Sequence, residues 1–463
     1  MTLIKSISGI RGTIGGNPGE ALTPLDIVKF TSAYAAFIAG QSDIRRIVIG
    51  RDARISGPML SGLVSSTLIG CGFDVIDLEL STTPTVEMAV VWEKAAGGII
   101  LTASHNPGQW NALKLLNHKG EFISDADGKA ILQLAEQDRF EYVPVDRLGQ
   151  YSRNDSYIQK HILSILGLGL VDVQAIQKKK FKVVVDAVNS SGGIAVPQLL
   201  RALGVDEVIE LYCTPDGKFP HNPEPLPENL SAIAHEVKIR KADLGIVVDP
   251  DVDRLCFVCE DGTMFGEEYT LVAVADYVLS HRKGNTVSNL SSTRALRDIT
   301  EKQGGTHYGT AVGEVNVVTK MKAVDAVIGG EGNGGIIFPE LHYGRDALVG
   351  IALFLTHLAN SNKKCSVLRA SYPDYFISKN KIELTPQINI DELLLSIKNK
   401  YKKQPHNTED GLKIEFDTDW IHLRRSNTEP IIRIYAESGH ESTAEKLAKN
   451  MIAEIGNLLK NHH

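Results

Sequence analysis

The sequence contains few cysteines and no long apolar run. Five cysteines in 463 residues are few and odd in number, so they do not form the framework of a disulfide-stabilised secreted protein. They suit a reducing compartment, and we expect a cytoplasmic location. No apolar run approaches the ~20 residues that a membrane span requires. The N-terminus, MTLIKSISGIRG, lacks the apolar segment of a signal peptide. We therefore predict that the protein has no membrane partner.

An excess of positive charge is also missing. The chain has 49 Lys and Arg against 56 Asp and Glu, a net charge of −7, which argues against nucleic acid as the main partner. Hydrophobic residues make up 43% and charged residues 23%, as in ordinary globular proteins. This composition excludes a disordered or fibrous protein. The length favours three or four domains.

Two of the cysteines, Cys256 and Cys259, form a CxxC pair within RLCFVCEDG. No second pair of Cys or His follows at the spacing that zinc ligands require. We interpret the pair as two buried thiols on a strand rather than as a zinc site.

Strand and helix patterns alternate along most of the chain. Short β-branched runs and alternating segments predict strands, and capped amphipathic segments predict the helices between them. The predicted strands occupy 45–50, 73–80, 97–102, 181–188, 206–212, 242–248, 285–290 and 324–330, with helices over 24–40, 58–70, 84–95 and 346–358. Such units imply parallel or mixed sheets covered by helices.

The chain from about Tyr372 differs, because alternating strands there accompany helices near 390–401 and 441–459. We predict an α/β protein with three related α/β domains and a C-terminal α+β domain. The expected boundaries are 1–150, 151–255, 256–370 and 371–463.

Three segments share one plan in which a buried strand leads into a polar loop. They are GGIILTASHN (97–106), LGIVVDPDVD (244–253) and AVIGGEGNGG (326–335). Ligands of open α/β sheets bind at the carboxyl ends of strands. We therefore expect the three loops, one per domain, to converge on a central cleft.

The loop DPDVD places Asp249, Asp251 and Asp253 at alternate positions, where side chains of an extended chain share one side. Two like charges ~4 Å apart repel by about 4 kcal/mol at an effective dielectric of 20, so the trio indicates a cation. Oxygen ligands without His or Cys favour Mg²⁺ or Ca²⁺. A solvated acidic turn is the alternative. An EF-hand is rejected, because Arg254 stands where that loop needs Gly.

TASHNP (102–107) places Ser104 after an apolar strand, without the GxSxG elbow of a hydrolase. Lys114 follows nearby and is a candidate for proton transfer, although most lysines are merely solvated.

GGEGNGG (329–335) contains GxGxxG, but no helix pattern follows it, so a dinucleotide site is not supported. Its Glu331 and Asn333 suit the hydroxyls of a sugar. The segment LRRSNTEPIIR (423–433) combines guanidinium groups, hydroxyls and an amide, which can bind an anion. A surface turn is the alternative.

Together these motifs resemble the α-D-phosphohexomutase superfamily over essentially the whole chain. The pieces that carry the resemblance are SGIRG (8–12), GRDAR (50–54), TASHNP (102–107), NALK (111–114), DPDVDR (249–254), GGEGNGG (329–335) and RRSNTEP (424–430). The resemblance implies four domains, the last of which binds phosphate. It also implies a mutase that moves phosphate between two positions of a hexose through a phosphoserine and a hexose 1,6-bisphosphate.

The resemblance assigns a role to each candidate residue. Ser104 would be the phosphoserine and would bind Mg²⁺ with the three aspartates of DPDVD. Arg254 would support the phosphoryl group, while Arg11, Lys114 and His105 would assist proton transfer. Glu331 and Asn333 would face the sugar. The phosphate that does not react would be held by Arg424, Ser426, Asn427, Thr428 and Arg433.

The sequence also departs from the family pattern. Gly335 stands where many members have His, and Asn333 stands where many have Ser. Because that His is missing, Lys114 and Arg11 would carry more of the acid–base catalysis. GEGNGG and the TEPxxR spacing are closest to the phosphoglucosamine mutase branch. The alternatives are a phosphoglucomutase/phosphomannomutase, a Mg²⁺-dependent phosphatase with an Asp nucleophile, and a non-catalytic sugar-phosphate binding protein. We expect a phosphosugar substrate and a monomer or homodimer.

Overall fold

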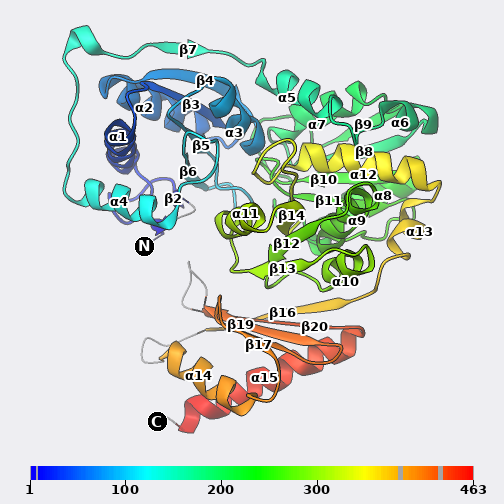
Figure 1. Ribbon diagram of the computed structural model, residues 1–463. Coiled ribbons are helices and arrows are strands. Elements are labelled where there is room, and N and C mark those ends of the chain that lie inside the picture. Colours follow the sequence, from blue (N-terminus) through cyan, green and yellow to red (C-terminus); the bar gives the residue numbers. More distant parts are fainter. Residues whose placement is uncertain (1, 7–8, 384–388, 426–430, 462–463) are drawn as a thin grey trace. The chain divides into compact units, whose positions relative to one another are not determined.

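The computed structural model describes residues 2–6, 9–383, 389–425 and 431–461. The chain divides into two compact units (Figure 1). The first comprises Met1–Val278 and Asn333–Arg369, and the second comprises Leu279–Gly332 and Ala370–His463.

A seven-stranded mixed sheet forms the N-terminal part of the first unit, in the order β1-β2-β6-β5-β3-β4-β7. Its strands are β1 (Ile4–Ser6), β2 (Gly9–Thr13), β3 (Arg46–Arg51), β4 (Asp74–Leu80), β5 (Gly97–Leu101), β6 (Trp110–Leu116) and β7 (Tyr151–Arg153). Strand β3 is parallel to β4 and β5, whereas β6 is antiparallel to both β5 and β2. The predicted strands β3, β4 and β5 are confirmed. Strands β2 and β6, on which the SGIRG and NALK motifs lie, were not predicted.

Helices cover both faces of this sheet (Figure 1). They are α1 (Pro24–Gln41), α2 (Gly57–Gly70), α3 (Thr83–Trp92) and α4 (Asp125–Glu136). Helix α5 (Tyr157–Leu166) follows and packs against α3. Successive side chains of a strand point to opposite faces. Ile47 and Ile49 of β3 accordingly join one buried cluster with α1 and α2, while Val48 joins another with α3. The expected Thr23 cap of α1 is present as a capping box with Asp26.

A second sheet of four strands completes the first unit, in the order β11-β10-β8-β9. Its strands are β8 (Lys182–Asp186), β9 (Glu207–Leu211), β10 (Leu244–Val248) and β11 (Leu255–Cys259). The further elements are α6 (Val173–Lys179), α7 (Gly192–Ala202), α8 (Ser231–Arg240), α9 (Glu267–His281), β15 (Gly335–Ile337), α12 (Ala347–Ser361), α13 (Cys365–Arg369) and the 3-10 turns η1 (Val145–Arg147) and η2 (Pro227–Asn229). Cys256 and Cys259 are both buried on β11, as predicted.

The second unit contains a parallel arrangement in which β12 lies between β13 and β14. These elements are β12 (Asn285–Asn289), α10 (Ala295–Lys302), β13 (His307–Thr310), α11 (Glu314–Ala323) and β14 (Ala326–Glu331).

The C-terminal part of the second unit is the predicted α+β module. An antiparallel sheet in the order β16-β20-β19-β18-β17 has α14 and α15 on one face (Figure 1). Its elements are β16 (Phe376–Glu383), α14 (Ile390–Lys400), β17 (His406–Asn407), β18 (Leu412–Glu415), β19 (Trp420–Arg425), β20 (Ile431–Ser438) and α15 (Glu441–Asn461). Ile397 of α14 and Met451 of α15 pack with Leu423 and Ile434 of the sheet.

Among the described residues, no helix combines the length and the apolar character needed to cross a membrane.

Candidate functional site

Ser104 lies in the loop directly after β5 and is almost fully buried, with 7% of its surface exposed. Its backbone adopts a left-handed conformation, φ 49°, which is uncommon for residues other than Gly and turns the side chain out of the strand direction. The Ser104 N–H donates to Thr102 Oγ1 at 2.9 Å, and Ser104 Oγ donates to Asp249 Oδ2 at 2.7 Å. The predicted serine and the first predicted metal ligand are therefore in direct contact.

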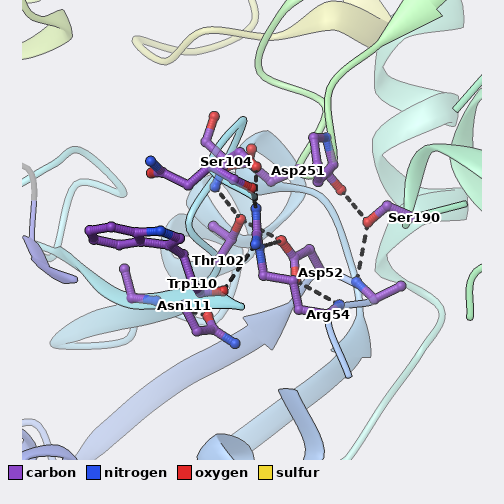
Figure 2. A network of polar contacts seen from close by, with 12 residues as sticks. Asp52, Arg54, Thr102, Ser104, Trp110, Asn111, Ser190 and Asp251 are labelled. Atoms are coloured by element: carbon purple, nitrogen blue, oxygen red, sulfur yellow. Dashed lines mark hydrogen bonds and ion pairs between the residues drawn. The ribbon is translucent and has the colours of Figure 1, made fainter. Parts of the chain in front are cut away.

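Arg54 holds the Ser104 loop in place. Its guanidinium donates to the carbonyl oxygens of Ser104, Asn106, Pro107 and Trp110 over 2.5–2.9 Å. Asp52 in turn accepts from Arg54 Nε at 3.0 Å and from Thr102 Oγ1 at 2.7 Å (Figure 2). Sequence analysis did not single out Arg54, although its position just after a predicted strand, in GRDAR, was an available signal.

Ser190 connects this loop region to the DPDVD loop. It follows β8, accepts from Ala53 N at 3.2 Å and donates to the Pro250 carbonyl at 2.7 Å (Figure 2). The GRDAR loop and the DPDVD loop are therefore held together through one buried hydroxyl.

Asp249, Asp251 and Asp253 are completely buried and follow β10. One carboxylate oxygen of each lies within 4.8 Å of the others. The loop curls back on itself, because the backbone N–H groups of Asp253 and Arg254 both donate to Asp249 Oδ1 at 3.1 Å. Burial, followed by the charges of Asp253 and Asp251, raises the pKa of Asp249 well above its ordinary value.

Two cationic side chains partly compensate the three carboxylates. Lys114 Nζ donates to Asp251 Oδ2 at 2.6 Å and to Asp253 Oδ2 at 3.4 Å, and Arg345 Nη2 donates to Asp253 Oδ2 at 2.7 Å. Burial alone would raise the pKa of Asp253, but Arg345 and Lys114 outweigh it and hold that pKa below its ordinary range. Burial would lower the pKa of Lys114, yet Asp251 and Asp253 raise it overall, so the ammonium is charged at neutral pH.

The donor set fits a hard divalent cation. Asp251 Oδ1 and Asp253 Oδ1 are buried oxygens without a hydrogen-bond partner among the described residues. Leaving such atoms unpaired is costly, and a cation bound by carboxylate oxygens would satisfy both. The three aspartates with Ser104 Oγ supply only oxygen, which selects Mg²⁺ or Ca²⁺ over softer metals.

Arg345 is a site residue that sequence analysis missed. Its side chain fills the space beside Gly335, where an added Cβ would lie 2.3 Å from Arg345 Cδ. Gly335 therefore leaves room for the guanidinium that contacts Asp253. The sequence offered little indication of this role, because the pattern GRDA predicts only the start of a helix.

Arg11, His105 and Arg254 surround the Ser104 loop with further donors. The Nε atoms of Arg11 and Arg254 are buried and have no hydrogen-bond partner among the described residues, which suits an anion. His105 Nδ1 lies 3.4 Å from Ser104 Oγ. Burial, followed by the charges of Arg254 and Arg11, holds the pKa of His105 well below its ordinary value, so its imidazole is neutral at pH 7.

The GGEGNGG loop is divided between the two units. Glu331, at the end of β14 in the second unit, is 4% exposed and accepts from Asn289 Nδ2 and Gly313 N, both at 3.0 Å. Asn333 lies in the first unit, where its Oδ1 accepts from Gly335 N at 3.2 Å. The loop forms no helix, in agreement with the rejection of a dinucleotide site.

Arg424 on β19 and Arg433 on β20 are direct cross-strand partners. Like charges in this position destabilise a sheet, so their pairing indicates an anion site. Arg424 Nε is buried without a hydrogen-bond partner among the described residues. Burial lowers the pKa of Arg424, as does the charge of Arg433, while Asp410 raises it. The other three residues predicted for this cradle, Ser426, Asn427 and Thr428, lie outside the described residues.

Comparison with known families covers nearly the whole chain. The four domains of the phosphoglucomutase/phosphomannomutase family match in order: alpha/beta/alpha domain I over residues 3–142, domain II over 155–262, domain III over 266–375 and the C-terminal domain over 387–454.

Individual relatives agree with the family match. A phosphoglucomutase/phosphomannomutase of Thermococcus kodakarensis is 35% identical over 97% of this chain and 99% of its own. A phosphoglucosamine/phosphogalactosamine mutase of Sulfurisphaera tokodaii is 32% identical over 96% of this chain and 97% of its own. The crystal structure of a phosphoglucomutase/phosphomannomutase family protein from Burkholderia thailandensis superposes with a TM-score of 0.86 at 26% identity, covering 99% of this chain and 98% of the other. The contact of a serine with a buried acidic triad agrees with the four matching domains and with the full-length relatives. The chain therefore belongs to the phosphoglucomutase/phosphomannomutase family, within the α-D-phosphohexomutase superfamily of isomerases.

Proposed function

We propose that the protein interconverts hexose 6-phosphate and hexose 1-phosphate through a phosphoserine at Ser104, with glucosamine phosphate as the preferred sugar. The observation that carries this proposal is the contact between Ser104 Oγ and Asp249, beside two buried oxygens of the triad that have no hydrogen-bond partner in the described part of the chain. A serine in this position can exchange a phosphoryl group next to a cation.

The proposed reaction consists of two transfers. A hydroxyl oxygen of the sugar monophosphate attacks the phosphorus on Ser104, the bond from phosphorus to Ser104 Oγ breaks, and the hydroxyl proton passes to a nearby base. The product is a hexose 1,6-bisphosphate. Ser104 Oγ then attacks the phosphorus of the other phosphate, and the bond from that phosphorus to its sugar oxygen breaks. The proton held by the base passes to the released sugar oxygen, so no atom or electron is lost overall.

Side chains around Ser104 are proposed to carry out the proton transfers of the reaction. Neutral His105, 3.4 Å from Ser104 Oγ, can accept a proton. Lys114 is charged and can donate one. Arg11 and Arg254 can direct to a phosphoryl group the Nε–H groups that have no hydrogen-bond partner within the described ranges. These donors stabilise the charge that the phosphoryl oxygens carry during transfer.

The cation proposed for the triad is Mg²⁺, one per chain, which would neutralise phosphoryl charge when bound. Its ligands would be Asp249, Asp251, Asp253 and the oxygen on Ser104. The four-domain match and the all-oxygen donor set support this choice. A cytoplasmic location and a monomer or homodimer remain predictions from the sequence.

Glu331 and Asn333 are proposed to contact sugar hydroxyls, and Arg424 and Arg433 are proposed to bind the phosphate that does not react. Ser426, Asn427 and Thr428 complete this cradle in the proposal. The cross-strand pairing of the two arginines supports an anion there.

Glucose phosphate and mannose phosphate are the alternatives to glucosamine phosphate as the preferred substrate. The Thermococcus kodakarensis relative, at 35% identity, is named phosphoglucomutase/phosphomannomutase. Initial rates with glucosamine 6-phosphate, glucose 1-phosphate and mannose 1-phosphate, each with its matching bisphosphate, test the choice. The highest specificity constant for glucosamine phosphate is expected. A higher value for glucose or mannose would replace the glucosamine assignment, and release of inorganic phosphate without isomerisation would indicate the phosphatase alternative.

Arg424→Ala and Glu331→Gln should have different effects. A charge-assisted guanidinium–phosphate bond is worth about 1.5–3 kcal/mol. Arg424→Ala should therefore lower the specificity constant for all phosphosugars alike, by roughly ten- to a hundredfold, in both reaction directions.

Glu331→Gln removes a charged acceptor and should affect sugars unequally, according to the hydroxyls it contacts.

Both variants are measured with the same three sugars. Exposed Arg240 on α8 donates to Glu236 of the same helix and provides the control Arg240→Ala, which should leave the specificity constants unchanged. A change of sugar preference in Arg424→Ala, together with uniform loss in Glu331→Gln, would reverse the two assignments.

A further inference from the structure

A second cluster of metal-ligating side chains lies in the first unit, apart from the aspartate triad. It consists of His161 on α5, His342 in the loop after β15, and Asp346 at the N-cap of α12. His161 Nε2 and His342 Nε2 approach the same oxygen, Asp346 Oδ2, at 2.9 and 3.3 Å. The two imidazole rings are nearly perpendicular, at 87°, with centroids 6.2 Å apart.

Each of the three side chains is fixed by a contact on its far side. His161 Nδ1 is hydrogen-bonded to Thr85 Oγ1 at 2.9 Å, whereas His342 Nδ1 lies 3.5 Å from Glu87 Oε2 without forming a hydrogen bond. Asp346 Oδ1 accepts from the backbone N–H groups of Leu348 and Val349. Imidazole ligands of metals are normally oriented in this way by a partner of the other ring nitrogen. Both Nε2 atoms are directed at Asp346 Oδ2, and the three ligand atoms lie within 4.8 Å of one another.

The spacing also suits a small divalent cation. With metal–ligand distances near 2.0 Å, the ligand atoms of a tetrahedral zinc site lie about 3.3 Å apart. The two separations found here, 2.9 and 3.3 Å, are close to that value. His161 and Asp346 are fully buried, but the His342 side chain is 12% exposed, so a cation and a fourth ligand such as water can enter from its side.

We propose that His161, His342 and Asp346 form a second cation site, selective for a borderline divalent metal of the Zn²⁺ class and distinct from the all-oxygen triad. Two imidazoles and one carboxylate favour Zn²⁺ or Co²⁺ over Mg²⁺. Without a cation, Asp346 Oδ2 is the shared partner of both Nε2 atoms, and His342 Nδ1 has no hydrogen-bond partner among the described residues. A cation would be bound by both imidazoles and the carboxylate at once.

The site would stabilise the segments that position the triad. It joins α5 and the N-terminus of α12 to each other, and Thr85 links it to α3, which packs against α5 (Figure 1). On α3, Thr83 Oγ1 donates to Asp251 Oδ2 at 2.5 Å, and next to Asp346, Arg345 contacts Asp253. The second cation is thus a structural one that holds two neighbours of the triad.

Zinc retention by the full-length protein tests the proposal. Chelator-treated protein is loaded with Zn²⁺ in the presence of excess Mg²⁺ and then desalted. Wild type and Asp251→Asn should each retain about one Zn²⁺ per chain, because the triad does not contribute to the site. X-ray absorption of the bound zinc should show two imidazole ligands. His342→Gln should bind Zn²⁺ at least tenfold more weakly, whereas the control His235→Gln, at an exposed position on α8, should behave as wild type.

Zinc with oxygen ligands only, or no retained zinc in wild type, would show that the cluster is a metal-free hydrogen-bond network. Equal zinc affinity in wild type and folded His342→Gln would also show that the cluster is a metal-free hydrogen-bond network. If His342→Gln does not fold, the X-ray absorption of wild-type protein decides alone, because it counts the imidazoles directly.

Discussion

Ser104→Ala is expected to abolish mutase turnover, with a loss on the order of 10⁴-fold or more, as is typical when an enzyme loses its nucleophile. The substitution removes the hydroxyl that donates to Asp249, and with it the proposed site of phosphorylation. The loop itself should persist, because Arg54 holds it through main-chain carbonyl groups that alanine retains. Stability should fall by no more than about 1–3 kcal/mol, the cost of one buried hydrogen bond.

The measurement combines initial rates, thermal unfolding and intact mass. Wild-type protein incubated with hexose bisphosphate should gain the mass of one phosphoryl group, mapping to residues 102–107, and Ser104→Ala should not. Ser65→Ala is a matched control, since Ser65 is buried on α2 and its hydroxyl has no hydrogen-bond partner among the described residues. Full mutase activity in Ser104→Ala would refute the phosphoserine mechanism.

Asp251→Asn is expected to raise the Mg²⁺ concentration for half-maximal activity by at least about tenfold, equivalent to about 1.4 kcal/mol of cation binding. Asp251 Oδ2 accepts from Lys114 and Thr83. An asparagine keeps these bonds only by directing its carbonyl oxygen at them. Its NH₂ group then occupies the position of Oδ1, the buried oxygen without a hydrogen-bond partner in the described part of the chain. A donor would replace a cation ligand, in addition to the lost charge.

Activity titrated with Mg²⁺ after EDTA treatment measures this effect. Wild type should lose activity in EDTA and regain it with Mg²⁺. Asp186→Asn is the control, because Asp186 is an equally buried carboxylate at the end of β8 that pairs with His221 and lies outside the triad. Undiminished wild-type activity after exhaustive EDTA treatment would remove the metal from the mechanism.

Local patterns in the sequence were sufficient to predict most of the fold. Short runs rich in β-branched residues predicted β3, β8 and β10, alternation of apolar and polar residues predicted β4, and the Thr23 cap predicted the start of α1. These features depend on neighbours within a few residues, so they can be recognised without knowing the tertiary structure. The same holds for the three polar loops, because the end of a buried strand already predicts a ligand-binding position.

Strand β6 shows where local patterns were insufficient. Its residues, WNALKLL, are interrupted by Asn and Lys, and both side chains are buried. Burial of a lysine is favourable only when carboxylates are nearby. Here Asp251, which lies 137 residues away along the chain, provides one.

The sequence by itself determined the residue types of the site: a serine, an acidic trio and clustered arginines, each at the end of a strand. Only the tertiary structure decided which of them meet. Ser104 and Asp249 are 145 residues apart, and Arg345 reaches Asp253 through space that Gly335 leaves free. Arg54 acts on the Ser104 loop from a different strand, and His161 meets His342 and Asp346 from a different helix. The reason is physical: such contacts follow from strand order and helix packing, which bring distant segments together and leave no periodic trace in the sequence.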